Sequence, residues 1–334
     1  MYFGFDAEQL AMRDGLRDLL TDACPPSVVR AEWDKPLERG RASALWGQLA
    51  DLGLLGLLGP VAEGGMGGDE VDLVLLMEEC GRFAVPGPLL EHVAVGVPAL
   101  VSSGDERVAA AIAGELVVAV HGPGPYVVGA DGADVLLVLD GAQARLAETE
   151  HVRLGEPVRS VDRSVRLFAP EVSSSTLLDG VDTELAYDRA ALAVAAQLLG
   201  LADHMIEMTV RYVKARTQFG VPVGAQQAVK HHLATALIAL EHARPVVLGA
   251  AYALANSHRH RRRDVSHAKV YAWRAAHGAA RAALQCHGAI GYTWEHDLQL
   301  WMKRVWALAP VWGTVAEHEL RVADAILSAG GTDD

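Results

Sequence analysis

One short segment separates two long apolar stripes of helical period: Arg216-Thr217-Gln218-Phe219-Gly220-Val221-Pro222. Its glycine and proline are typical of a helix C-cap, in which Gly220 takes the left-handed turn and Pro222 starts the next element. A cap does not require an arginine, a glutamine and a phenylalanine together, nor the Gln226-Gln227 pair that follows. An exposed arginine beside an aromatic ring and side-chain amides suits a diphosphate and an adenine ring. Both interpretations, a cap and a binding site, remain open at this level.

The chain around this segment, from 179 to 334, is predicted to be a four-helix bundle rich in alanine. Apolar residues recur at helical spacing in three stripes: Leu192, Ala195, Leu199, Ala202, Ile206, Thr209 and Val213; Leu233, Leu237 and Leu240; and Val270, Trp273, Ala280 and Leu284. Pro245 should kink or split the second of these helices after Glu241, because proline lacks the N–H and clashes with the preceding turn.

Two further zones precede the bundle. Residues 1–112 have helical periodicity, including a helix over 71–83 that Val85-Pro86-Gly87-Pro88 must stop. From 113 to 178, short β-branched runs alternate with turn residues and predict a small antiparallel sheet or barrel. These runs are Leu116–Val120, Tyr126–Val128, Val135–Leu139 and Val165–Phe168. No helix there is long enough for a βαβ crossover, which argues against a Rossmann domain. The predicted fold is therefore mainly α with a small β domain.

Composition excludes several classes of protein. The chain has 334 residues, of which 51% are apolar and 21% charged, so it is long and apolar enough for a large core. A net charge of −13 argues against nucleic-acid binding. The charge is uneven, since residues 1–199 carry 14 basic and 31 acidic side chains and residues 200–334 carry 15 and 11. A phosphorylated ligand is therefore expected on the second part.

Cysteine and histidine usage favours neither disulfides nor metal. The three cysteines are widely spaced, and the adjacent His231-His232 would point to different sides of a helix, without HExxH or clustered carboxylates. The start of the chain lacks the basic and apolar regions of a signal peptide, and no apolar run approaches the ~20 residues of a membrane span. We expect a cytoplasmic protein.

A second segment, Gln285-Cys286-His287-Gly288-Ala289-Ile290-Gly291-Tyr292, follows the last long stripe. Small residues after a helix are usually a cap, but two glycines near a glutamine also leave backbone N–H groups that could meet a phosphate. Together with Arg216–Pro222, this segment resembles the acyl-CoA dehydrogenase family, whose bundle carries Arg-x-Gln-Phe-Gly-x-Pro and then Gln-x-x-Gly-Gly-x-Gly-Tyr. The stretch 45–82 also resembles the family's N-terminal helices. The order of a helical domain, a β domain and a helical bundle is the family's architecture.

This resemblance implies FAD as cofactor and an acyl-CoA as substrate, which loses its α-proton to a carboxylate and its β-hydride to flavin N5. In such enzymes the two segments reach across a subunit interface to the partner's FAD. The residues implied as FAD contacts here are Arg216 and Gln285 at the diphosphate, Gln218, Phe219, Val223 and Gln226 at the adenosine, and Gly288, Ala289 and Thr314. Ala289 replaces the family's usual second glycine, which could slightly hinder the approach of the backbone.

Two departures from the family pattern are present. The usual catalytic glutamate precedes a Gly-Thr pair, and Trp312 stands there. Some members instead carry the base one residue before an arginine on the first long helix; here Asp188 precedes Arg189, so Asp188 is a candidate base and Arg189 a candidate substrate contact. Asp188 could equally be a solvated or arginine-paired carboxylate near a helix start. The second departure is a short β domain that lacks the family's flavin-ring segments.

These features resemble the smaller subunit of the hetero-oligomeric acyl-CoA dehydrogenases of actinobacteria, in which a longer homologous partner carries base and flavin ring. Steroid side-chain thioesters are one substrate class of that group, and an electron-transfer flavoprotein is the expected electron acceptor. Two alternatives stay open: a self-sufficient dehydrogenase that uses Asp188, and a scaffold or a different flavin reaction on the same fold.

Overall fold

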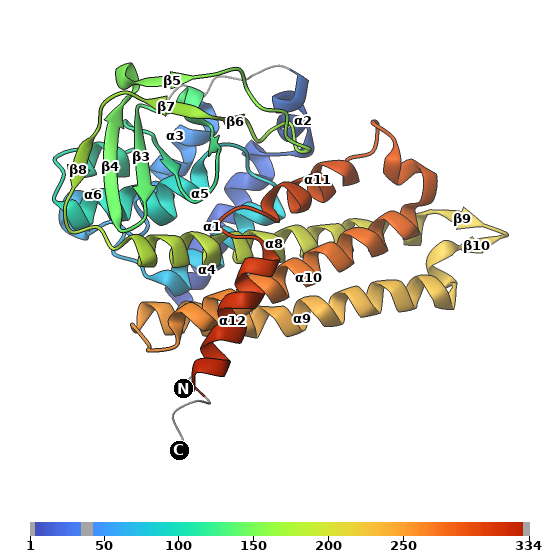
Figure 1. The fold of residues 1–334 in the computed structure, drawn as a ribbon. Helices are drawn as coiled ribbons and strands as arrows, with labels where there is room; N and C mark the ends of the chain where they lie inside the picture. Colours follow the sequence, from blue (N-terminus) through green and yellow to red (C-terminus); the bar gives the residue numbers. More distant parts are fainter. Residues whose placement is uncertain (1–3, 35–42, 330–334) are drawn as a thin grey trace.

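A computed structural model describes residues 4–34 and 43–329 (Figure 1). The N-terminal part is helical, as expected from its periodicity. Its helices are α1 (Ala7–Ala23), α2 (Pro26–Asp34), α3 (Ala44–Asp51), α4 (Glu70–Arg82), α5 (Leu89–Glu91), α6 (Val97–Ser103) and α7 (Val108–Ile112), and a π-helical segment, η4 (His92–Gly96), joins α5 to α6. Asp6 and Asp69 cap α1 and α4 through their side chains, which explains where these two helices begin.

The β domain is a mixed sheet rather than the antiparallel one expected. Its strands are β1 (Val118–His121), β2 (Val127–Val128), β3 (Val135–Asp140), β4 (Gln143–Glu148), β5 (Val152–Leu154), β6 (Leu167–Phe168), β7 (Pro170–Val172) and β8 (Thr176–Leu178). The main sheet has the order β1-β3-β4-β8, and β1 pairs with β3 in parallel. The alternation of strand and turn residues predicts strands but not their direction, because pairing direction depends on how the connections run in space.

The C-terminal part is the predicted helical bundle. It consists of α8 (Thr183–Ala215), the hairpin β9 (Thr217–Gln218) and β10 (Val221–Pro222), α9 (Gln227–Ala255), α10 (Arg261–His287), α11 (Leu298–Leu308) and α12 (Val315–Ala329). In Figure 1, α8, α9 and α10 run side by side, and the hairpin lies at the end of the bundle away from the β domain.

The expected break at Pro245 is wrong: α9 continues through it. The neighbouring Arg244 forms ion pairs with Glu241 on the same helix and with Glu78 and Asp203 on other helices. Proline removes one hydrogen bond from the helix. The ion pairs that Arg244 forms with neighbouring helices can hold the chain helical next to the proline. Tertiary contacts, and not local helix propensity, therefore keep α9 continuous here.

Two glycines allow α4 and α8 to pack backbone against backbone. A Cβ on Gly200 would lie 1.8 Å from the carbonyl oxygen of Glu78, and a Cβ on Gly81 would lie 2.1 Å from that of Gln197. Real Cβ atoms do not approach backbone oxygen this closely, so both positions require glycine. This close crossing joins the N-terminal domain to the bundle.

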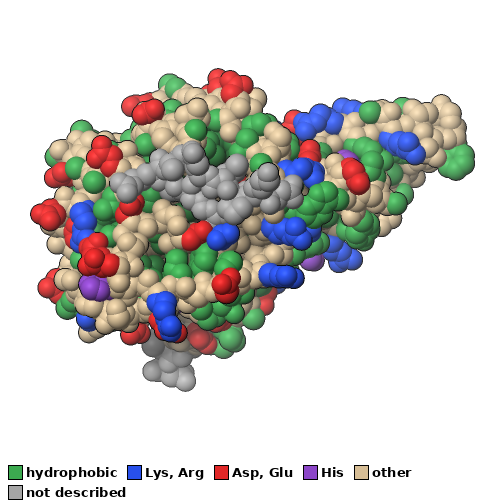
Figure 2. Space-filling view, turned by 90° about the horizontal axis from the view of Figure 1, so that it is seen from above, with side chains coloured by type: hydrophobic (Ala, Val, Ile, Leu, Met, Phe, Trp, Pro, Cys, Tyr) green, Lys and Arg blue, Asp and Glu red, His purple; other side chains and the backbone are tan. Residues whose placement is uncertain are grey.

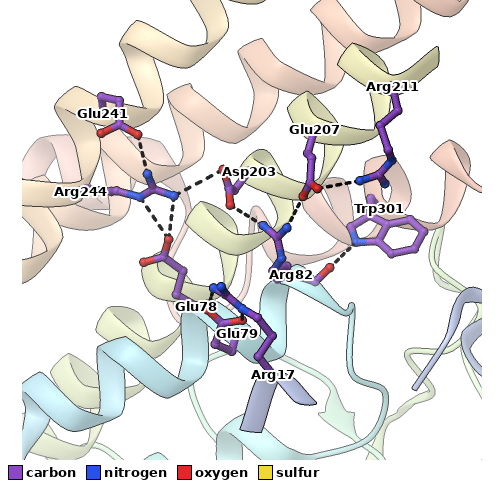
Figure 3. Close-up of polar contacts among 10 residues, drawn as sticks. All are labelled: Arg17, Glu78, Glu79, Arg82, Asp203, Glu207, Arg211, Glu241, Arg244 and Trp301. Atoms are coloured by element: carbon purple, nitrogen blue, oxygen red, sulfur yellow. Dashed lines mark hydrogen bonds and ion pairs between the residues drawn. The ribbon is translucent and has the colours of Figure 1, made fainter. Parts of the chain in front are cut away.

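A network of charges surrounds the crossing (Figure 3). Arg82 at the end of α4 pairs with Asp203 and Glu207 of α8, and Arg244 of α9 pairs with Glu78 of α4 at 3.1 Å. The indole N–H of Trp301 on α11 donates to the carbonyl of Arg82 at 2.9 Å. These ion pairs therefore join α4, α8 and α9, and the hydrogen bond of Trp301 adds α11.

Two helices, α8 and α9, are long and apolar enough to cross a membrane by length and composition alone. The apolar window of α8 is 83% buried in the protein, as in the core helix of a globular domain, whereas that of α9 is 28% buried. Leu237 and Ile238 of α9 are exposed by 43% and 56%. The α9 helix therefore presents uncovered apolar surface.

The face shown in Figure 2 has a broad end and a narrower arm. Most of its acidic side chains lie over the broad end, and several Lys and Arg side chains lie along the arm. The uneven charge of the sequence is therefore also uneven in space.

Candidate cofactor-binding and ligand site

The structure brings the two segments singled out in the sequence to the same end of the bundle. Tyr212, one turn before the end of α8, stacks on His287, the last residue of α10, with ring centroids 4.3 Å apart. His287 in turn contacts His296 edge-on at 4.6 Å. These packed rings fix the end of α8, which carries Arg216, beside the end of α10, which carries Gln285.

The β9–β10 hairpin holds Phe219 in a strained position. Gln218 pairs with Val221 across the hairpin, so Phe219 and Gly220 form a two-residue loop. Both have positive φ, 50° and 79°, as a type I′ turn requires. Such turns favour Asn-Gly, because a side chain larger than that of asparagine or aspartate is disfavoured at positive φ. Phe219 is nevertheless 98% exposed, so burial in this chain does not offset the strain.

The predicted cofactor contacts of the hairpin are accessible. Arg216, Gln218 and Gln226 are exposed and Val223 is half-buried. The side chain of Arg216 forms no hydrogen bond or ion pair with the residues that the structure describes. The backbone around it is ordered by hydrogen bonds from Arg216 N to Tyr212 O at 2.9 Å and from Val223 N to Arg216 O at 2.8 Å. A rigid backbone therefore presents a free guanidinium.

The end of α10 contributes a second set of accessible groups. Gln285, Gly288 and Ala289 are exposed. Gly288 has φ +65° and ends α10, donating its N–H to the carbonyl of Leu284. A Cβ at Gly288 would meet nothing within 4 Å, so this glycine is required by its backbone conformation and leaves an open surface beside it. An exposed amide and bare backbone at a helix end are compatible with a phosphate group.

Thr314 lies elsewhere, at the start of α12. Its N–H and hydroxyl both bond to the carboxylate of Glu317, at 2.7 and 2.9 Å, in a helix cap. The structure therefore brings together the hairpin and α10 residues of the predicted FAD site, but not Thr314.

Asp188 is a buried, arginine-paired carboxylate. Its side chain is 1% exposed, and Arg321 of α12 donates to Oδ1 at 2.6 Å. Burial raises the pKa of Asp188, and Arg321 opposes this shift. Oδ2 has no hydrogen-bond partner among the described residues. Arg321 lines the adjacent cavity of about 710 Å³, whereas Asp188 is not part of its lining.

Arg189 points away from that cavity. Its guanidinium Nε donates to Glu70 at 2.6 Å, and the Glu70 carboxylate is 5% exposed. Glu70 begins α4, so this buried ion pair joins α4 to α8. The contact gives Arg189 a structural partner.

Two buried or partly buried charged residues, Arg321 and Glu91, were not singled out in the sequence. Arg321 pairs with Asp188 from 133 positions further along the chain. Glu91 is buried, with 6% of its surface exposed, and lines a second cavity of about 170 Å³ together with Trp312. Burial raises the pKa of the Glu91 carboxyl to about 7. The available signal for Glu91 was a single acidic residue in the stretch 89–100, where His92 is the other polar residue.

Comparisons with known proteins decide the family. The acyl-CoA dehydrogenase N-terminal domain model matches residues 6–117, and the C-terminal domain model matches residues 181–327. The acyl-CoA dehydrogenase IpdE2 of Mycolicibacterium smegmatis is 31% identical over 94% of this chain and 97% of its own length. The chain belongs to the acyl-CoA dehydrogenase family. This confirms the resemblance drawn from Arg216–Pro222 and Gln285–Tyr292.

Solved structures confirm the acyl-CoA dehydrogenase fold. The Tcur3481-Tcur3483 steroid acyl-CoA dehydrogenase superposes with a TM-score of 0.86 at 23% identity, covering 97% of this chain and 99% of that one. The ChsE4-ChsE5 complex from Mycobacterium tuberculosis superposes with a TM-score of 0.85 at 20% identity, covering 98% and 99%. Acyl-CoA dehydrogenases are FAD-dependent oxidoreductases, and the accessible groups at the hairpin and the α10 end fit an FAD diphosphate and adenosine.

Proposed function

We propose that this chain is the subunit of a hetero-oligomeric acyl-CoA dehydrogenase that supplies the adenosine and diphosphate contacts of an FAD held mainly by a longer homologous partner. The observation that carries the proposal is Phe219, which is 98% exposed at a backbone angle that disfavours it. A strained, exposed aromatic ring is retained at a functional site when another molecule covers it. The hairpin points away from the β domain of its own chain, which favours an FAD bound to a neighbour.

The residues at this end have separate roles in the proposal. The free guanidinium of Arg216 and the amide of Gln285 bind the diphosphate, where a charge-assisted hydrogen bond is strong. Phe219 covers the adenine ring, and Gln218, Val223 and Gln226 surround the adenosine. Gly288 and Ala289 leave space for the ligand beside exposed backbone. When bound, the flavin accepts the β-hydride of the acyl thioester.

Neither Trp312 nor Asp188 is well suited to be the catalytic base, which favours a partner chain that supplies the base. Trp312 has no proton acceptor on its ring. Asp188 is separated from the larger cavity by Arg321, which pairs with it. The reduced β domain, with its four-stranded main sheet, agrees with a flavin ring bound elsewhere.

A partner surface is available on α9. Its exposed apolar residues include Leu237 and Ile238, and an apolar face of this kind on a soluble protein is usually covered. The ChsE4-ChsE5 structure is that of a complex, and the Tcur3481-Tcur3483 protein is a steroid acyl-CoA dehydrogenase. By analogy we propose a longer homologous chain as the partner, an acyl-CoA with a steroid-derived or fatty acyl group as substrate, an electron-transfer flavoprotein as acceptor, and the cytoplasm as location.

The decisive experiment co-expresses this chain with a longer homologue and compares Arg216→Ala with the unmodified complex. Loss of one charge-assisted hydrogen bond of about 1.5–3 kcal/mol should weaken FAD binding about tenfold or more. Bound flavin is measured by absorbance after gel filtration, and turnover with added FAD. Arg153→Ala is the matched control, because Arg153 is 78% exposed in β5 and, among the residues that the structure describes, pairs with Glu171 alone at the surface. Unchanged FAD content and activity in Arg216→Ala would leave the chain as a scaffold and refute the proposal.

A self-sufficient dehydrogenase with Asp188 as base remains a second candidate. It is supported by the raised pKa of this carboxyl and by its unbonded Oδ2. Expressed alone, the chain would then contain FAD and turn over, and Asp188→Asn would abolish turnover while flavin stays bound. If Asp188→Asn keeps the turnover of the unmodified chain, Asp188 is not the base and this second function is excluded.

A further inference from the structure

The turn between α11 and α12 holds Trp312 in an unfavourable backbone conformation. Trp312 has φ +54°, which is a genuine outlier for a bulky side chain. The next residue, Gly313, has φ +97°. Strain of this kind persists only where the surrounding structure imposes it, and it concentrates at functional sites.

Buried polar groups impose this conformation. Lys269 of α10, fully buried, donates from Nζ to the carbonyl oxygen of Val311 at 2.5 Å and to that of Leu308 at 3.4 Å. The Nε2 atom of His318, also fully buried, bonds to the carbonyl oxygen of Trp312 at 2.9 Å. The backbone on both sides of the indole is therefore held from inside the bundle.

The indole lines two neighbouring cavities. Trp312 is 5% exposed and lines both the cavity of about 710 Å³, with Tyr187 and Arg321, and the cavity of about 170 Å³, with Glu91. Gly122 of the β domain also lines both. A Cβ on Gly122 would lie 2.5 Å from the indole ring, so the ring packs directly on that backbone.

The smaller cavity is suited to an apolar group. Its lining is mainly aliphatic and aromatic: Val120, Val128, Val165, Leu167, Pro310 and Val311, with Tyr126. Glu91 is the buried acidic group beside it, and a hydrogen bond from Trp312 partly offsets the cost of burying this carboxyl. The indole is thus held on one side by Glu91 and on the other by Gly122.

We infer that Trp312 blocks the entry of an acyl chain into the smaller cavity of this chain. The nature of the ligand, an acyl-CoA thioester, rests on the proposed function. With the indole in place, an acyl chain that enters the larger cavity does not reach the smaller one. Removal of the indole would join the cavity of about 710 Å³ to the apolar cavity of about 170 Å³, so that an acyl chain could enter the latter.

The test uses the full-length chain alone, with free CoA and octanoyl-CoA as probes in isothermal titration calorimetry. The unmodified chain should bind both with dissociation constants within about twofold of each other. Trp312→Gly removes the ring and relieves the positive φ, and it should bind octanoyl-CoA about tenfold or more tightly than CoA, because burial of about two methylene groups suffices for that ratio. Trp306→Ala, at a partly exposed tryptophan of α11, should behave like the unmodified chain.

Circular dichroism establishes that each variant is folded, and Trp312→Asn provides a second variant because asparagine tolerates positive φ. The inference is overturned if folded variants at position 312 gain no preference for octanoyl-CoA over the unmodified chain, whether both proteins bind the thioester or neither does. No flavin or partner is present, so this result is independent of the FAD content of the Arg216→Ala complex.

Discussion

At the scale of single residues, Phe219 lowers the stability of the isolated chain and is expected to contribute to ligand binding instead. Its φ of +50° in a two-residue hairpin loop favours asparagine or glycine, and its ring contacts solvent over nearly all its surface. The chain on its own therefore gains nothing from phenylalanine at this position. A residue that breaks a local rule without a local gain is expected where a ligand or partner binds.

Phe219→Asn should therefore change stability and cofactor binding in opposite directions. The isolated chain should gain about 0.5–1 kcal/mol in the free energy of unfolding, because asparagine suits the turn. The complex with a partner should bind FAD several-fold more weakly, through loss of stacking. Urea denaturation and flavin titration measure the two effects. A loss of stability in the isolated chain would show that the ring packs within this protein.

The buried Lys269 makes a prediction about pH. Burial lowers the pKa of its ammonium from 10.5 to about 7, and no carboxylate compensates among the causes of the shift. Between these values the unfolded chain binds more protons than the folded one, so the free energy of unfolding rises as the pH increases from about 7 to about 10.5. Below pH 7 the cost of the buried charge is present in full.

Urea denaturation at pH 7 and at about pH 9.5 tests this contribution. The rise in stability should be smaller in Lys269→Met than in the unmodified chain. Lys214→Met serves as control because Lys214 is exposed at the end of α8. An equal rise in all three proteins would assign the pH dependence to other groups.

At the scale of elements, the crossing of α4 and α8 depends on Gly81 and Gly200. Their missing side chains bring the two helices into backbone contact, and the ion pairs of Arg82 and Arg244 surround that contact. Periodicity in the sequence predicts both helices but not their distance, because a glycine inside a helix has the same sequence signal whether it packs against a backbone or faces solvent. The packing role of these two glycines therefore could not be predicted from the sequence.

Gly200→Ala and Gly278→Ala should have opposite effects. The Cβ of the first would overlap the carbonyl oxygen of Glu78, so stability should fall by about 1–3 kcal/mol or more. Gly278 lies inside α10 with nothing within 4 Å of a Cβ, so alanine there should stabilise by about 0.5–1 kcal/mol. Thermal and urea unfolding of the isolated chain measure both. Similar changes in the two variants would contradict the close crossing.

At the scale of the whole molecule, the candidate cofactor contacts of the hairpin and of the α10 end lie far from the β domain of the same chain (Figure 1). The exposed hairpin, the exposed end of α10 and the apolar surface of α9 all lie on the bundle. Such an arrangement fits a protein whose site is completed by another chain. The apolar part of α8 is mostly buried and that of α9 is not, so the partner that we propose would cover α9.

Flavin stoichiometry tests this arrangement. The chain purified alone should carry little FAD, and after mixing with a longer homologue the complex should contain one FAD per pair of chains. Absorbance of bound flavin, with protein mass from light scattering, measures the ratio. A yellow, fully active assembly of this chain alone would contradict the requirement for a partner.

Local information in the sequence determined the helices, four of the strands, the three-zone architecture and the family, because helical period, β-branched runs and the Arg216–Pro222 motif are properties of adjacent residues. The tertiary structure decided what depends on distant residues. It paired Asp188 with Arg321, placed Glu91 beside Trp312, made β1 parallel to β3 and kept α9 intact through Pro245. Each of these depends on side chains or strands brought together by packing, and the energy of such contacts has no periodic signature along the chain.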